Sequence, residues 1–161
     1  MKVTEKDGIH IESDSKIVAD SRSSEGDINF VSHAHFDHMH LGGSDIVSSE
    51  LTARLAETRS GEEVKRVETS EIDLIPSGHI VGSSAALIKG EKDVLYTGDV
   101  ALRDRVYLEG FEPVSADILI VESTYGIPAY SFPDQRVIEK RIKDFVQGET
   151  SPLILFGYSL G

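Results

Sequence analysis

The chain has 161 residues, of which 39% are hydrophobic and 27% charged, and its formal net charge is −12. This composition predicts a single globular domain and argues against a disordered chain. The absence of cysteine excludes disulfides and thiolate metal sites, and it suits a cytoplasmic protein. No apolar run reaches the roughly 18 residues of a membrane span. Residues 1–7 lack the apolar core of a signal peptide, so we expect neither membrane insertion nor secretion.

The acidic excess also bears on possible partners. The chain has 16 Lys and Arg against 28 Asp and Glu. Affinity for nucleic acid comes largely from Lys and Arg, so an extended phosphate-binding face is not expected on this segment. If the substrate is a nucleic acid, much of the basic groove must lie elsewhere.

Short apolar runs between turn residues predict a chain rich in strands. The predicted strands cover residues 8–12, 16–20, 27–32, 45–47, 71–75, 84–89, 93–97, 116–121 and 152–156. The strands at 84–89 and 93–97 form a hairpin around Gly90.

Two helices are predicted among these strands. Ser49 caps the first, over about 50–58, and Ser60-Gly61 ends it. The second starts at 131–134 and places its apolar side chains on one face up to Gly148. Those side chains are Ile138, Ile142, Phe145 and Val146. Strands come first, and helix alternates with strand later, so the expected class is a sheet-rich α/β fold.

The segment His33–His38 follows the predicted strand at 27–32 and holds three imidazoles and one carboxylate in six residues. Neutral imidazole and carboxylate are ligands that Zn²⁺ prefers. Desolvating so many polar groups at a strand end is costly unless something pairs with them. The segment therefore predicts a site for one metal ion or for a pair.

Three later strands also end in polar residues that suit such a site: His79, Asp99 and Glu122. Ligand sites form at strand ends in many α/β folds, so these side chains are expected to converge on one rim. Gly78 and Gly98 would let the backbone turn tightly before the ligand. Taken singly, these three residues are more often a structural histidine, a turn residue and a strand-end charge. His10 and His40 receive no role.

The segment His33–His38 resembles the metal-binding motif of the metallo-β-lactamase superfamily. Gly78-His79 and Gly98-Asp99 resemble later ligand positions of that superfamily, in the same order.

Two further segments resemble motifs of the β-CASP branch, the nucleases of RNA and DNA. They are Gly-His-Ile-Val-Gly-Ser-Ser at 78–84 and Glu-Ser-Thr-Tyr-Gly at 122–126. Residues 155–161 resemble the segment that leads into the inserted β-CASP domain. The resemblance implies the N-terminal portion of an αββα sandwich, truncated before or at the insertion. Residues 1–150 would belong to the metallo-β-lactamase domain, and 151–161 would lead into the absent β-CASP domain.

The resemblance also implies a site with two zinc ions when complete. One zinc would be held by His33, His35 and His79, the second by Asp37 and His38, with Asp99 bridging the two. A metal-bound hydroxide would attack the phosphodiester, since Zn²⁺ lowers the pKa of water to roughly 7. Asp37 would help to orient that hydroxide. Glu122 would support a histidine that assists the leaving group.

The chain departs from the family pattern, because no histidine follows His79. One ligand of the second zinc and the leaving-group acid are therefore missing. The chain is expected to be a fragment of a longer protein, or a subunit whose site a homodimer or a second chain completes. Alone it is expected to be weakly active or inactive.

The leading interpretation is a zinc-dependent nuclease acting on RNA, similar to archaeal mRNA 3′-end processing factors and exonucleases. A DNA exonuclease of the ligase-associated type is the first alternative, because the residues that would tell RNA from DNA are expected in the missing part. A non-catalytic truncated partner subunit is the second. A hydrolase of lactams or thioesters is disfavoured, since the Glu122–Gly126 segment has no evident role there.

Overall fold

The structure is a computed structural model that describes residues 1–22, 25–39, 41, 45–105 and 107–158. These residues form two compact units, 1–122 and 123–158, which are described separately here. In the described part of the chain, no helix is both long enough and apolar enough to cross a membrane.

The first sheet contains β1 (Lys2–Glu5), β2 (Ile9–Glu12), β3 (Lys16–Ala19) and β4 (Ile28–Phe30), in that spatial order. The pairs β1–β2 and β2–β3 are antiparallel, whereas β3–β4 is parallel. The sequence did not predict β1. Its four residues are all exposed at the edge of the sheet, so they lack the apolar alternation that marks a half-buried strand.

The second sheet contains β5 (Ile72–Pro76), β6 (Ser84–Ile88), β7 (Val94–Tyr96) and β8 (Ile118–Ile120), also in chain order. The predicted hairpin around Gly90 is confirmed, because β6 pairs antiparallel with β7. β8 pairs parallel with β7.

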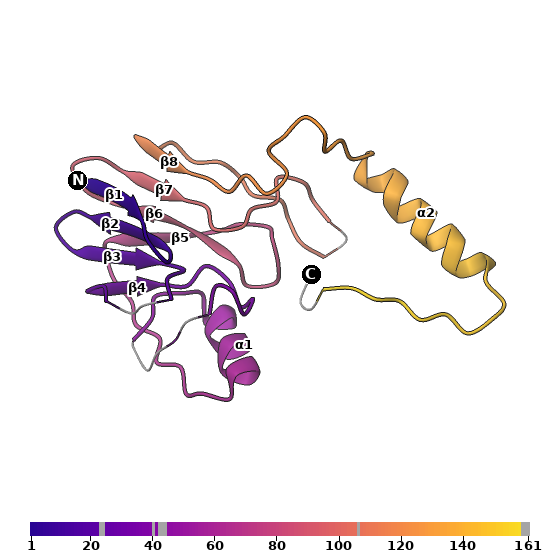
Figure 1. Cartoon of the computed structure of the whole chain (residues 1–161), viewed down its shortest axis with the longest axis horizontal. Coiled ribbons are helices and arrows are strands. Elements are labelled where there is room, and N and C mark those ends of the chain that lie inside the picture. Colours follow the sequence, from indigo (N-terminus) through magenta and orange to yellow (C-terminus); the bar gives the residue numbers. More distant parts are fainter. Residues whose placement is uncertain (23–24, 40, 42–44, 106, 159–161) are drawn as a thin grey trace. The chain divides into compact units, whose positions relative to one another are not determined.

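The two sheets pack against each other around a shared core (Figure 1). Ile11, Ile17 and Phe30 from the first sheet meet Ile88, Val94 and Tyr96 from the second. The rings of Phe30 and Tyr96 lie edge to face, with centroids 6.1 Å apart. The predicted mixed α/β content is therefore confirmed, with two four-stranded sheets.

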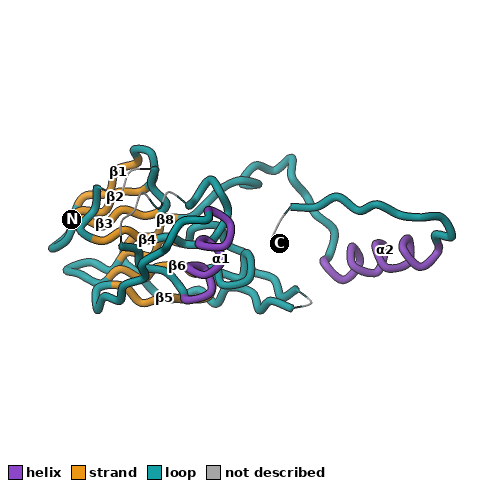
Figure 2. Tube along the Cα trace, turned by 90° about the horizontal axis from the view of Figure 1, so that it is seen from below, coloured by secondary structure: helices purple, strands orange, loops and turns teal. Residues whose placement is uncertain are grey.

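The first helix, α1 (Glu50–Ser60), begins and ends where the sequence predicts. The Ser49 side chain accepts a hydrogen bond from the Thr52 backbone N–H, and Gly61 ends the helix at φ +72°. Figure 2 shows the strands of both sheets gathered together with α1 beside them. Ala56 of α1 is fully buried in a cluster with Val31, Ala34 and Met39. The helix is thus packed against the loop that follows β4.

The predicted strand at 45–47 appears only as isolated bridges. Val47 pairs with Phe30, and Ile46 pairs with Arg66. The segment therefore continues the first sheet beyond β4 without forming a strand of its own.

The second unit contains α2 (Gln135–Gly148), capped by Asp134, as predicted. Ile142, Phe145 and Val146 remain exposed on it. The predicted strand at 152–156 is wrong, since the structure assigns no strand there and all five residues are exposed. A strand needs a neighbour for its backbone hydrogen bonds, and the described residues of this unit contain no other strand.

Candidate metal centre

Four predicted residues meet at the ends of strands from both sheets. His33 and His35 follow β4, His79 follows β5, and Asp99 follows β7. One nitrogen or carboxylate oxygen from each lies within 4.8 Å of the others. The predicted convergence of these side chains is therefore present in the structure.

The spacing of these donor atoms suits a tetrahedral metal ion. His35 Nδ1 lies 3.0 Å from His33 Nε2 and 3.3 Å from His79 Nε2. Asp99 Oδ2 lies 3.4 Å from His79 Nε2 and 3.8 Å from His33 Nε2. Ligand atoms about 2.0–2.1 Å from a tetrahedral zinc lie roughly 3.3 Å apart. Three imidazoles and one carboxylate are also a donor set that zinc accepts.

Burial keeps the first imidazole of this group neutral. The His33 side chain is fully buried, and desolvation lowers its pKa to about 2, with further lowering from three neighbouring imidazoles. His33 therefore carries no proton that a metal ion would have to displace near neutral pH. Burial also lowers the pKa of His79, although the Asp99 charge opposes that shift.

Asp99 occupies a position between two groups of imidazoles. Its Oδ2 faces His33 and His79, while its Oδ1 lies 3.8 Å from His38 Nε2. Burial raises the Asp99 pKa, and the His38 and His79 charges partly offset that rise. A carboxylate with its two oxygens directed to different imidazoles has the geometry of a bridging ligand.

Asp20 is an important part of this centre that the sequence analysis missed. It follows β3, its side chain is buried, and it has a left-handed backbone with φ +46°. Its carboxylate accepts hydrogen bonds from the Ser32 backbone N–H (2.8 Å), the Ser32 hydroxyl (2.5 Å) and the Tyr96 hydroxyl (2.8 Å). His38 Nδ1 lies 3.0 Å from the same carboxylate. These contacts make Asp20 an orienting group rather than an open ligand.

The Asp20 contacts decide which imidazole nitrogens face the centre. The single hydroxyl hydrogen of Ser32 goes to Asp20, so Ser32 Oγ accepts from His33 Nδ1, 2.9 Å away. His33 Nε2 is then left without a proton and faces the other ligands. In the same way, the bond from His38 Nδ1 to Asp20 leaves His38 Nε2 directed toward Asp99.

The charge of Asp20 also governs the protonation of His38. Burial lowers the His38 pKa, but the hydrogen bond to Asp20 and the charges of Asp20, Asp99 and Asp37 together outweigh burial, so the pKa is raised. We expect Asp20→Asn to lower the His38 pKa, because the amide removes that charge. NMR titration of the metal-free protein would measure this shift. We also expect metal affinity to fall by about 10- to 100-fold, the usual effect of losing such an orienting contact.

Asp45→Asn is the matched control for this variant, because Asp45 pairs with Lys65 on the surface. It should leave both the His38 titration and metal affinity unchanged. An unchanged His38 pKa in Asp20→Asn would contradict the role assigned to Asp20.

Two other predicted residues lie at the margin of the centre. The Asp37 side chain is 77% exposed, and its Oδ2 lies 3.7 Å from His38 Nε2. The described residues contain two groups of potential ligands, and Asp37 belongs to neither. The first group is His33, His35, His79 and Asp99, and the second is Asp20, His33 and His38. Glu122 is half-buried and accepts a hydrogen bond from the Val100 backbone N–H at 3.1 Å. Its charge raises the pKa of Asp99, so it lies within electrostatic reach.

The loop that carries His79 is held from both sides. Gly78 has φ +70°, and a Cβ there would lie 2.6 Å from the Ala101 carbonyl oxygen, so the tight turn predicted for this glycine is present. The Arg105 guanidinium donates hydrogen bonds to the carbonyl oxygens of Gly78 and His79. These contacts fix the backbone on which the His79 imidazole depends.

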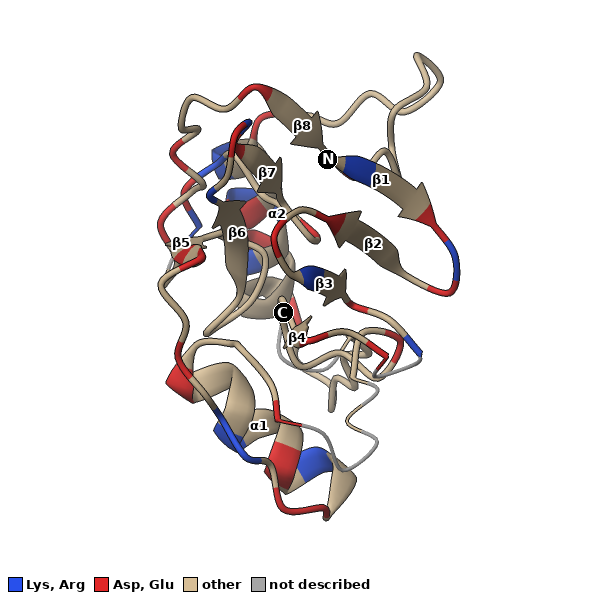
Figure 3. Cartoon of the chain, turned by 90° about the vertical axis from the view of Figure 1, so that its left-hand side faces the viewer, with Lys and Arg blue, Asp and Glu red and all other residues tan. Residues whose placement is uncertain are grey.

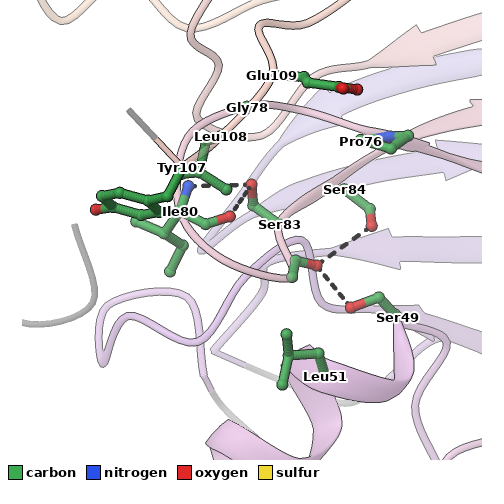
Figure 4. A pocket seen from close by; sticks show the side chains of 11 residues that line it. Ser49, Leu51, Pro76, Gly78, Ile80, Ser83, Ser84, Tyr107, Leu108 and Glu109 are labelled. Carbon is green, nitrogen blue, oxygen red and sulfur yellow. Dashed lines mark hydrogen bonds between the residues drawn. The ribbon is translucent and has the colours of Figure 1, made fainter. Parts of the chain in front are cut away.

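A pocket of about 470 Å³ lies between this loop, the start of α1 and residues 107–109 (Figure 4). Hydroxyl groups in and beside the pocket hold the loop in place. Ser49 in the lining and Thr52 beside it donate to the Gly82 carbonyl oxygen at 2.6 Å and 2.8 Å. The Ser83 hydroxyl accepts from the Ile80 backbone N–H and donates to the Ile80 carbonyl oxygen. These hydrogen bonds therefore link the start of α1 to the loop that carries His79.

Two histidines received no predicted role. His10 lies on β2, its side chain is buried, and its Nε2 contacts the Lys6 carbonyl oxygen at 2.8 Å. His40, which received no role, lies outside the described residues.

Figure 3 shows acidic residues spread over many loops and strand ends rather than gathered at one place. This distribution agrees with the net charge of −12 as a general surface property.

Comparisons with known proteins add a second kind of observation. No protein-family model matches the sequence. The chain is 36% identical over 151 residues to a probable DNA ligase of Opitutus terrae, a match covering 83% of this chain and 15% of the ligase. It is 28% identical over 156 residues to probable RNase MJ4 of Methanocaldococcus jannaschii, covering 68% of this chain and 36% of that protein. It is 33% identical over 90 residues to RNase aCSPSF2 of Saccharolobus solfataricus, covering 53% of this chain and 18% of that protein.

The names point to nucleases. The identities are modest, and the chain spans well under half the length of each of these three relatives. RNase names predominate, and the DNA ligase match covers most of the present chain. These names agree with the metallo-β-lactamase and β-CASP resemblance of the sequence motifs.

Proposed function

We propose that this chain is the metal-binding portion of a β-CASP nuclease of the metallo-β-lactamase superfamily, and that it acts on phosphodiester bonds in RNA. The observation that carries the proposal is the convergence of His33, His35, His79 and Asp99 within 4.8 Å. The RNase names of several relatives support RNA as the substrate. In this proposal the two packed sheets are the core of the αββα sandwich, residues 1–150 belong to it, and residues 151–161 lead into the β-CASP domain.

Each residue of the centre has a distinct task in this proposal. His33, His35 and His79 hold one zinc, Asp37 and His38 contribute to a second, and Asp99 joins the two positions. Zinc bound there would lower the pKa of water to about 7 and neutralise charge on the phosphate. Ser32 and Asp20 hold the Nδ1 atoms of His33 and His38, so in the neutral imidazoles the Nε2 atoms are the ones directed to the metal positions.

Asp37 and Glu122 act at the edge of this centre. The exposed Asp37 carboxylate can accept a proton from the attacking water, since it is open to solvent and close to His38. Glu122 bonds to the backbone of Val100, next to Asp99, and so steadies the loop that presents the bridging carboxylate. In the family pattern it also supports a histidine beyond this chain.

One observation favours DNA as the alternative substrate. The match to the probable DNA ligase extends over 83% of this chain, more than any of the RNase matches given above. A DNA exonuclease of the ligase-associated type would use the same metal centre. The two candidates differ in the substrate, not in the ligands.

The test uses the zinc-loaded chain with 5′-labelled single-stranded RNA and DNA of the same sequence. We expect slow RNA cleavage that a chelator abolishes and that His79→Ala reduces to the background rate. Preferential DNA cleavage would select the alternative. A parent chain that binds no zinc, or His79→Ala protein as active as the parent, would overturn the proposal for this chain.

A further inference from the structure

Phe36 is an exposed aromatic side chain inside the metal-binding loop. It lies between His35 and Asp37 and is 61% exposed, whereas Ala34 in the same loop is 1% exposed. Fully burying a phenylalanine side chain is worth about 1.5–3 kcal/mol. A ring left in solvent next to the metal ligands is therefore a candidate contact for the substrate.

The ring is held in place from α1. The guanidinium carbon of Arg59, in the last turn of that helix, lies 4.3 Å from the Phe36 ring centroid. This is a cation–π contact, which fixes the ring on one side. α1 itself is packed against the loop through Ala56, Ala34 and Met39. The ring thus projects from a supported loop and not from a chain end.

The charges around the ring favour stacking over phosphate binding as its task. Asp37 directly follows Phe36, Asp99 and Glu122 place further acidic charge in or near the metal centre, and the chain as a whole has a net charge of −12. The Arg59 guanidinium lies against the ring itself. A surface of this kind offers few phosphate contacts, which usually supply most nucleic-acid affinity. Stacking of a base on an aromatic ring needs no net charge and contributes about 1–3 kcal/mol per base.

We propose that Phe36, supported by Arg59, is a stacking platform for a nucleobase of the single strand that enters the metal centre. The inference rests on the proposed function, because it assumes a nucleic-acid substrate. Every base has a π-face, so this contact would position the strand without selecting its sequence. Phe36 is accordingly a positioning residue next to the ligands.

The test compares Phe36→Leu with Phe36→Tyr in the zinc-loaded chain. The probes are a labelled single-stranded oligonucleotide and an abasic strand with the same number of phosphates, measured by fluorescence anisotropy. For Phe36→Leu we expect the Kd of the base-bearing strand to rise about five- to 150-fold. The Kd of the abasic strand should not change, and Phe36→Tyr should bind as the parent does.

Two controls separate stacking from structural damage. Zinc content should be equal in all variants, because Phe36 is not a ligand. Phe145→Leu removes another exposed aromatic ring, 55% exposed on α2, and should leave both Kd values unchanged.

The possible failures are distinguishable. The stacking role is overturned, and the proposed function stands, in either of two cases. In the first, Phe36→Leu binds the base-bearing strand as tightly as the parent does. In the second, Phe36→Leu raises the Kd of the base-bearing and abasic strands equally. If the parent binds neither strand, the proposed function fails and the inference fails with it.

Discussion

Replacing His35 with alanine is expected to lower zinc affinity by more than about 100-fold and to reduce the zinc content of the purified chain. The His35 Nδ1 atom lies 3.0 Å from His33 Nε2 and 3.3 Å from His79 Nε2, so it is central to the four-donor group. Losing even an indirect partner of a metal ligand typically costs 10- to 100-fold in affinity, and a direct ligand should cost more. Elemental analysis of protein purified without chelator measures the effect.

The parent chain should contain about two zinc ions if both positions form, and about one if the second awaits a ligand. His10→Gln is the matched control, since His10 Nε2 contacts the Lys6 carbonyl oxygen at 2.8 Å and an amide can keep that bond. Its zinc content should equal that of the parent. Full zinc content in His35→Ala would contradict the assignment of His35 as a zinc ligand.

Metal removal should also lower the melting temperature of the parent more than that of His35→Ala. An ion that binds only the folded chain stabilises it by mass action, and the variant has little of that stabilisation to lose. Thermal unfolding with and without chelator gives this second readout.

Gly98→Ala is expected to destabilise the metal-free chain by about 2–5 kcal/mol. Gly98 has φ +54°, and a Cβ there would lie 2.6 Å from Ser32 Cβ and 2.7 Å from Ser32 Oγ. The left-handed backbone costs a non-glycine residue about 1–2 kcal/mol, and the clash adds about 1–3 kcal/mol. Urea unfolding of the chelator-treated protein measures the free energy.

Gly61→Ala provides the matched control. Gly61 has φ +72°, but a Cβ there would meet nothing within 4 Å. Its substitution should cost only the backbone contribution, about 1–2 kcal/mol. Because the Ser32 hydroxyl connects His33 to Asp20, Gly98→Ala should also weaken zinc binding, whereas Gly61→Ala should not. Equal effects of the two substitutions would contradict the close approach of Gly98 to Ser32.

Several elements could be predicted because their signals are local. The ends of α1 follow from the Ser49 cap and Gly61, and the start of α2 follows from Asp134. The hairpin of β6 and β7 needs only a short connection around Gly90. Each of these signals lies within a few residues of the element that it marks.

Other elements could not be predicted, because they depend on a distant neighbour. β1 is exposed along its length, and only its pairing with β2 makes it a strand. Residues 152–156 have the apolar composition of a strand, yet they have no strand assigned in the structure. Composition predicts whether a segment suits a sheet, but a sheet edge must be available for the strand to form.

The sequence by itself determined which side chains can form the candidate centre. His33, His35, His79 and Asp99 stand out because each follows an apolar strand, and three of them are imidazoles. The tertiary structure alone decided the part played by Asp20, a single aspartate with no motif around it. The Asp20 backbone N–H donates to the Phe30 carbonyl oxygen, because β3 and β4 are parallel neighbours, and this brings its carboxylate to Ser32 and His38. A ligand is marked by its own chemistry, whereas an orienting group is defined by the atoms that folding places around it.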